Sequence, residues 1–119
     1  MPAEWRVKEH KVKTILEQEL HTEFDEQVTV PLRGSDKGYK FDIVSKDRTI
    51  VIEVKTLGYK KRKVSVNSRL SEACLWLLGT NAERKILVLT NEEPYKMFVK
   101  ERQYKIASSM GIQVRYVKA

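Results

Sequence analysis

Apolar residues recur along the chain with two spacings, one typical of helices and one typical of strands. Near the N-terminus, apolar side chains fall on one stripe at helical spacing, which predicts an amphipathic helix over about residues 3–21. The residues on this stripe are Trp5, Val12, Ile15, Leu16 and Leu20. Two further helices are expected at about residues 67–78, before Gly79, and 93–109, before Gly111.

Short runs rich in β-branched residues predict the strands of the protein. They cover about residues 26–32, 39–45, 49–56, 86–89 and 112–117. The resulting order, αβββαβαβ, predicts one α/β domain over residues 1–119, with a mixed sheet and helices on both of its faces.

Charged residues interrupt one of these apolar strands. Glu53 and Lys55 lie within the run Ile50–Lys55, two residues apart, so in a strand they share one face. Burying a carboxylate and an ammonium group is costly unless they are paired or bind something. The strand therefore predicts either a structural ion pair or a functional site.

The preceding strand carries a third charged residue, Asp42. A symmetric hairpin centred between Asp47 and Arg48 pairs residues whose numbers add to the same total, which places Asp42 opposite Glu53. Residues so paired have Cβ atoms about 4.5–5.5 Å apart. Two carboxylates at that distance repel each other, and a divalent cation would relieve the repulsion. Oxygen ligands without a nearby histidine favour Mg²⁺ or Mn²⁺.

The first predicted helix supplies a further acid. Glu9 lies on the apolar stripe, where a carboxylate needs a partner or a function, and Glu19 lies near the stripe as an alternative. Asp36, in the glycine-containing loop at residues 33–38, is a weaker alternative to Asp42 because a loop position does not oppose Glu53.

The chain is basic, with a net charge of +7, and the charge is unevenly distributed. Residues 1–26 contain four Lys/Arg and seven Asp/Glu, whereas the remainder contains nineteen and nine. This asymmetry favours a polyanionic partner on one side of the molecule, with a solvated basic surface as the alternative. A single cysteine, Cys74, a polar N-terminus and short apolar runs predict a cytoplasmic protein without disulfides or a zinc cluster.

Asp42, followed by Glu53-Val54-Lys55 and preceded by a helix bearing Glu9, resembles the motif of the PD-(D/E)xK nuclease superfamily. The closest resemblance is to small archaeal Holliday-junction-resolvase-like nucleases. It implies a restriction-endonuclease-like fold, an αβββαβ core, to which this chain appends an αβ unit. The chain departs from the motif at Phe41, where proline is common, and in a longer segment between Glu9 and Asp42.

The resemblance also implies an activity, Mg²⁺-dependent hydrolysis of DNA phosphodiesters, with Mn²⁺ as a substitute. Asp42, Glu53 and the carbonyl of Val54 would ligate metal, and Glu9 would hold it directly or through water. Lys55 would position or help deprotonate the attacking water and stabilise the charge of the transition state. An inactive DNA-binding module of the same fold and an RNA-processing nuclease are the alternatives.

Basic residues near this motif are candidates for binding the DNA backbone. They are Lys60, Lys61, Arg62, Lys63, Arg69, Arg33 and Lys37. No pattern for reading bases is evident, so we expect structure-selective or weakly sequence-specific cleavage of duplex or branched DNA.

By analogy with the same nucleases we expect a homodimer. Apolar residues of the second and third predicted helices are its candidate contacts: Trp76, Leu77, Leu78, Tyr95, Met97 and Phe98.

Overall fold

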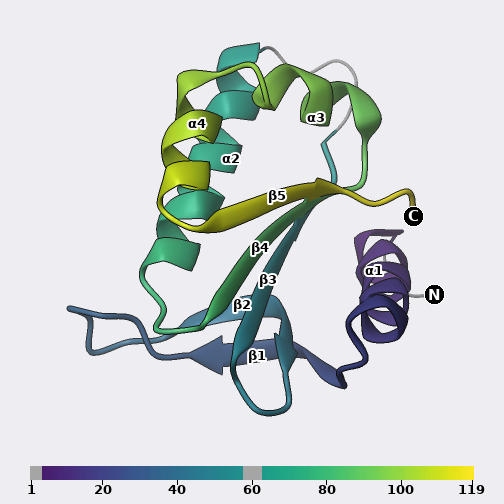
Figure 1. The fold of residues 1–119 in the computed structure, drawn as a ribbon, viewed down its shortest axis with the longest axis vertical. Helices are drawn as coiled ribbons and strands as arrows, with labels where there is room; N and C mark the ends of the chain where they lie inside the picture. The colour runs from purple at the N-terminus through teal and green to yellow at the C-terminus, as the bar shows by residue number, and fades with distance from the viewer. Residues whose placement is uncertain (1–3, 58–62) are drawn as a thin grey trace.

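A mixed β-sheet lies at the centre of the protein (Figure 1). The computed structural model describes residues 4–57 and 63–119, and within them the sheet has five strands. The elements, in chain order, are α1 (Glu4–Leu20), β1 (Phe24–Val30), β2 (Tyr39–Ser45), β3 (Ile50–Lys55), α2 (Lys63–Leu78), β4 (Arg84–Leu89), α3 (Glu92–Phe98), α4 (Arg102–Ser109) and β5 (Ile112–Tyr116).

The strands lie in the sheet in the order in which they occur in the chain, β1-β2-β3-β4-β5. β1, β2 and β3 are antiparallel neighbours. β3, β4 and β5 are parallel neighbours, and helices connect them along the chain. The predicted α/β class, the mixed sheet and the αβββαβ order of the core are therefore confirmed.

Helices cover both faces of the sheet, α1 on one side and α2, α3 and α4 on the other (Figure 1). Val12 and Leu16 of α1 pack on the first face against Ile43, Ile52 and other apolar residues. Leu70, Leu77 and Phe98 are among the residues that fill the second face. Two apolar layers thus hold the central strands, and β3 contributes to both of them.

The hairpin between β2 and β3 has the predicted register. Ile43 pairs with Ile52 and Val44 with Val51, so the symmetry centre lies between Asp47 and Arg48. The Asp47 carboxylate fixes the turn by accepting hydrogen bonds from the Ser45 hydroxyl at 2.7 Å and the Thr49 amide at 3.1 Å. The pairing recorded between the strands ends at Ile43 and Ile52, immediately before Asp42 and Glu53.

In β1 and in β2, the alternation of side chains between the two faces of the sheet reverses at the same level. Phe24 packs on the α1 side whereas Val28 packs on the α2 side, although regular alternation would put both on one face. Gln27 lies between them with a φ of 55°, a left-handed conformation that is rare in a strand. Its neighbours pair with Ile43 and Phe41, so Gln27 lies opposite Asp42.

The predicted third helix, residues 93–109, is wrong as a single element, because α3 ends at Phe98 and α4 begins at Arg102. Phe98 and Ala107 both belong to the buried layer on the α2 side. Nine residues of continuous helix would put these two side chains on opposite faces. The break lets both of them pack, and the appended unit is consequently ααβ rather than αβ.

The predicted stripe of the first helix is wider than the face that α1 buries. Glu9, Val12 and Leu16 are buried, whereas Trp5 and Ile15 are 46% and 38% exposed. Elsewhere, Cys74 is buried as expected, and burial raises the pKa of its thiol to about 11. In the described part of the chain no helix has the length and apolar character needed to cross a membrane.

This packing predicts different costs for shortening two neighbouring side chains of α1. Leu16→Ala should lower the free energy of unfolding by about 2–5 kcal/mol, because it leaves a cavity beneath the helix. Ile15→Ala, the control, should change it by less than about 1 kcal/mol because that side chain is partly exposed. Urea unfolding followed by circular dichroism measures both values, and equal losses would contradict the orientation of α1.

Candidate active site

Glu53 is a carboxylate in the interior of the sheet, with only 2% of its surface exposed. Its Oε1 atom accepts a hydrogen bond from the backbone N–H of Asp42 at 3.1 Å. Its Oε2 atom accepts one from the Tyr39 hydroxyl at 3.2 Å and lies 3.8 Å from the Lys55 ammonium nitrogen. The structure thus brings the predicted residues Asp42, Glu53 and Lys55 together.

Asp42 lies at the point where β2 and β3 separate. Its Oδ2 atom accepts a hydrogen bond from the backbone N–H of Val54 at 2.8 Å. The Glu53 carboxylate in turn accepts a hydrogen bond from the backbone N–H of Asp42. The two carboxylates therefore bind backbone N–H groups at the point where the pairing between β2 and β3 has ended. Val54 itself contributes its side chain to the α1-side layer.

Glu9 extends toward this point from α1, which covers the face of the sheet opposite α2 (Figure 1). Its side chain is buried, with 5% of the residue exposed. The Gln27 side-chain amide connects it to Asp42, donating to Glu9 Oε1 at 2.7 Å and approaching Asp42 Oδ1 at 3.4 Å. The sequence analysis missed Gln27. Its left-handed backbone and its place opposite Asp42 aim the amide at both acids, and neither feature is visible in the alternation of residues 26–32.

Asp42 interacts unfavourably with both Glu9 and Glu53. Burial, reinforced by the negative charge of Asp42, raises the pKa of Glu9 to about 7 and that of Glu53 to about 8. Lys55 opposes the rise at Glu53. Burial and the Glu53 carboxylate also raise the pKa of the Tyr39 phenol, which remains a neutral hydrogen-bond donor. Without a cation, the site therefore retains protons near neutral pH.

The donor set has the chemistry that Mg²⁺ prefers, since carboxylate oxygens are hard ligands. Within residues 4–57 and 63–119, no three His, Cys, Asp or Glu side chains are arranged to hold an ion together. Mg²⁺ is commonly held by one or two carboxylates, with water and substrate phosphate completing its shell. Asp42 and Glu53 would supply two such carboxylates, and Glu9 would hold a metal directly or through water.

A cleft of about 350 Å³ opens beside this site. Tyr39 and Lys55, which both contact Glu53, line it from the sheet side, and helix α2 provides the opposite wall. Its lining residues are Tyr39, Lys55, Thr56, Leu57, Arg69, Glu72, Ala73 and Trp76. Arg69, predicted as a DNA contact, therefore lines the same cleft as Lys55.

Other predicted residues lie elsewhere. Glu19 is hydrogen-bonded to Arg115 at 2.8 Å, which lowers its pKa, so Glu9 is the helix carboxylate that joins the site. Arg33 donates to the Thr80 carbonyl at 2.8 Å, beyond the C-terminal end of α2. Asp36 and Lys37 are exposed in a loop that projects from the sheet (Figure 1).

The remaining basic candidates follow β3. Lys60, Lys61 and Arg62 lie outside the described residues. Lys63 begins α2, and its side chain lies outside the described part as well.

Several of the residues expected at a dimer contact are part of the core. Leu77 and Phe98 are fully buried, and Trp76 stacks on Tyr39. The large exposed apolar side chains in the described part of this region are instead Leu75 of α2, Ile106 of α4 and Met110, which follows α4. Leu75 and Ile106 border a shallow apolar groove between α2 and α4.

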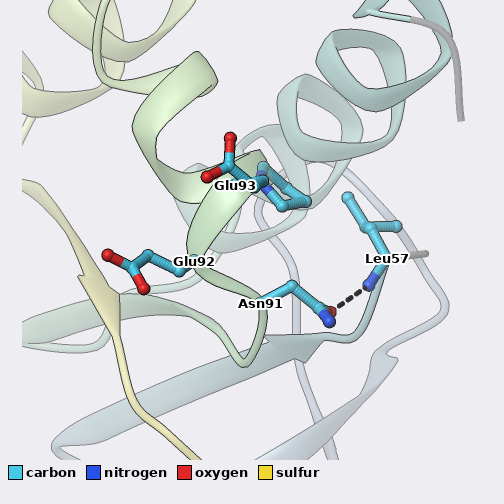
Figure 2. A pocket seen from close by; sticks show the side chains of 5 residues that line it. Leu57, Asn91, Glu92 and Glu93 are labelled. Carbon is cyan, nitrogen blue, oxygen red and sulfur yellow. Dashed lines mark hydrogen bonds between the residues drawn. The ribbon is translucent and has the colours of Figure 1, made fainter. Parts of the chain in front are cut away.

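A smaller polar cavity, of about 110 Å³, lies where β3 meets the start of α3. Figure 2 shows the Asn91 side chain accepting the backbone N–H of Leu57, at 2.9 Å, while Glu92 and Glu93 point in different directions. Asn91 thus restrains the chain two residues after Lys55, and the two glutamates do not form a common cation site.

The chain was compared with protein-family models, curated proteins and solved structures, and none of the three comparisons found a match. The geometry of the site is therefore the basis of the functional argument.

The raised pKa values predict how the stability of the metal-free protein depends on pH. Glu9 and Glu53 bind protons more tightly when folded than the ordinary glutamate pKa of 4.5 allows, with values of about 7 and 8. This stabilisation is complete below about pH 4.5 and is lost as the pH rises through 7 and 8. The free energy of unfolding should therefore fall between pH 5 and pH 8, and Glu53→Gln should reduce the fall.

Denaturant unfolding at several pH values in the presence of EDTA tests this dependence. Glu19→Gln is the matched control, because Glu19 is exposed and its pKa is lowered rather than raised. A stability of the wild-type protein that rises over this interval, or an equal effect of the two substitutions, would contradict the proposed repulsion.

Proposed function

We propose that this protein is a Mg²⁺-dependent endonuclease of the PD-(D/E)xK type that hydrolyses DNA phosphodiesters. The observation that carries the proposal is the meeting of Asp42, Glu53 and Lys55 where β2 and β3 separate, beside an open cleft. Lys55 only partly compensates the charge of Glu53, and Glu9 accepts a hydrogen bond from a neutral amide, that of Gln27. Here Glu9 and Glu53 retain raised pKa values, which a divalent cation would lower.

Asp42 and Glu53 are the proposed metal-holding side chains, assisted by Glu9 and by the carbonyl of Val54. A bound Mg²⁺ would neutralise charge on the scissile phosphate and lower the pKa of a bound water. Gln27 restrains Glu9 and Asp42, because its amide nitrogen donates to an oxygen of each carboxylate.

Besides the charge that a bound Mg²⁺ would bring, the ammonium group of Lys55 supplies a positive charge from the protein. Its side chain is one-third exposed, at 33%, and lies on the cleft while its nitrogen stays within 3.8 Å of Glu53. From there the ammonium group can orient an attacking water and stabilise the negative charge that develops on the phosphate. The hydrogen bond from Thr90 N–H to the Lys55 carbonyl, at 3.2 Å, restrains its backbone.

The charge distribution of the chain supports a nucleic-acid substrate. Arg69 lines the cleft, and the basic segment Lys60–Lys63 lies between β3 and the body of α2 in the sequence. Cations beside a metal site favour binding of the phosphate backbone. A homodimer is part of the proposal, and the α2–α4 groove bordered by Leu75 and Ile106 is an apolar surface that would suit it.

Cleavage assays with isosteric variants test the proposed activity. Asp42→Asn and Glu53→Gln keep the shape of the side chains but remove negative charge, and Lys55→Ala removes the ammonium group. Each should slow Mg²⁺-dependent cleavage by about 10²-fold or more. Duplex, flap, four-way and single-stranded DNAs form the substrate panel, with RNA versions to test an RNA-processing role.

Asp36→Asn is the matched control, since it makes the same chemical change at an exposed loop position. It should cleave at the wild-type rate. Full activity of Glu53→Gln would exclude the proposed site, and folded wild-type protein that binds DNA but cuts none of these substrates would favour an inactive binding module.

The basic segment predicts a change in the salt dependence of DNA binding. Replacing Lys61 and Arg62 together with Ala should flatten the slope of log K against log salt by about one to two units, because two phosphate contacts are lost. Lys100 and Arg102, which are exposed at the junction of α3 and α4, provide a control pair with the same charge. Equal slopes for the two double variants would assign Lys61 and Arg62 to a solvated surface.

A further inference from the structure

The wall of the cleft opposite the acids combines an aromatic side chain with charged ones. One face of α2 carries Arg69 and the residues three, four and seven positions after it, which are Glu72, Ala73 and Trp76. All of them line the cleft together with Lys55. This wall presents a guanidinium group, a carboxylate and the part of the Trp76 side chain that Tyr39 leaves uncovered to a single occupant.

Trp76 is held in place without being fully buried. Its ring stacks on Tyr39 with centroids 4.6 Å apart and an angle of 7° between the planes, and Tyr39 packs edge-on against Phe41 at 4.7 Å. The Tyr39 hydroxyl in turn donates to Glu53. The indole is therefore fixed relative to the proposed catalytic carboxylate through one intervening side chain.

These groups match the parts of a nucleotide. Aromatic side chains stack on bases, Lys55 and Arg69 complement phosphate, and the Glu72 carboxylate can accept a hydrogen bond from the amino group of a base. A base inside a duplex is stacked between its neighbours and offers no face to a protein ring, so a base that enters the cleft must be unpaired.

We infer that the cleft between Trp76 and Lys55 binds an unpaired nucleobase adjacent to the phosphate to be cut. The inference deepens the proposed nuclease function, on which it rests. It assigns a substrate class, DNA with a single-stranded, flapped or splayed nucleotide, and it gives the expected structure selectivity a physical basis.

Tryptophan fluorescence tests the inference without altering the cleft. The chain contains two tryptophans, and Trp5 is 46% exposed on α1, so Trp5→Phe leaves Trp76 as the reporter. A single-stranded DNA of about 12 nucleotides, added in EDTA so that no cleavage occurs, should quench the emission of Trp76. A base-free deoxyribose-phosphate chain of the same length should bind without this quenching. Equal quenching by both chains, or by neither, would overturn the inference.

A binding comparison provides the second measurement. Trp76→Leu keeps an apolar side chain but removes the stacking ring, and should weaken binding of the single-stranded DNA by about 5- to 100-fold. Binding of the base-free chain should be unchanged, whereas Arg69→Ala should weaken both ligands. An unchanged affinity of Trp76→Leu for the single-stranded DNA would contradict base stacking.

These measurements separate the two proposals because neither requires cleavage. Quenching by bases in a protein that cuts nothing would support the cleft and reject the nuclease. Cleavage without base-dependent quenching would support the nuclease and reject the base-binding cleft.

Discussion

The Asp42 carboxylate is the group on which the rest of the site depends. It lies where two antiparallel strands separate, and it accepts a hydrogen bond from the backbone N–H of Val54. Glu53 accepts a hydrogen bond from the backbone N–H of Asp42. The negative charge of Asp42 raises the pKa values of Glu9 and Glu53, and this effect adds to that of their burial. The carboxylates thus stabilise the opening of the sheet through hydrogen bonds and strain it through repulsion.

The fold supports this arrangement from both faces of the sheet. Val12 and Leu16 fix α1 against the first face, which brings Glu9 to the opening, and the layer on the second face fixes α2 with Trp76 and Arg69. The reversal of β1 at Gln27 is part of the same design. A left-handed residue in a strand costs about 1–3 kcal/mol, and such strain persists at sites where function requires it.

Local patterns were sufficient to predict the sheet and its central pair of acids. The symmetry of the turn at Asp47 and Arg48 fixed the register, and the charges within an apolar strand marked Glu53 and Lys55. The remaining features depend on tertiary packing. The break at residues 99–101 arises because Phe98 and Ala107 must pack on one layer, and Gln27 joins the site through a backbone reversal that no residue pattern reveals. The choice of Glu9 over Glu19 likewise depends on Arg115, which is distant in sequence.

A divalent cation would relieve the repulsion of Asp42 on Glu9 and Glu53. Calorimetric titration of Mn²⁺ into the protein near pH 7.5, in two buffers of different ionisation enthalpy, measures both binding and the protons released. The account predicts one saturable event per chain that releases protons, because the cation displaces them from carboxyls with raised pKa values. In Glu53→Gln, binding should weaken and proton release should fall. Absence of binding, or binding without proton release, would contradict the account.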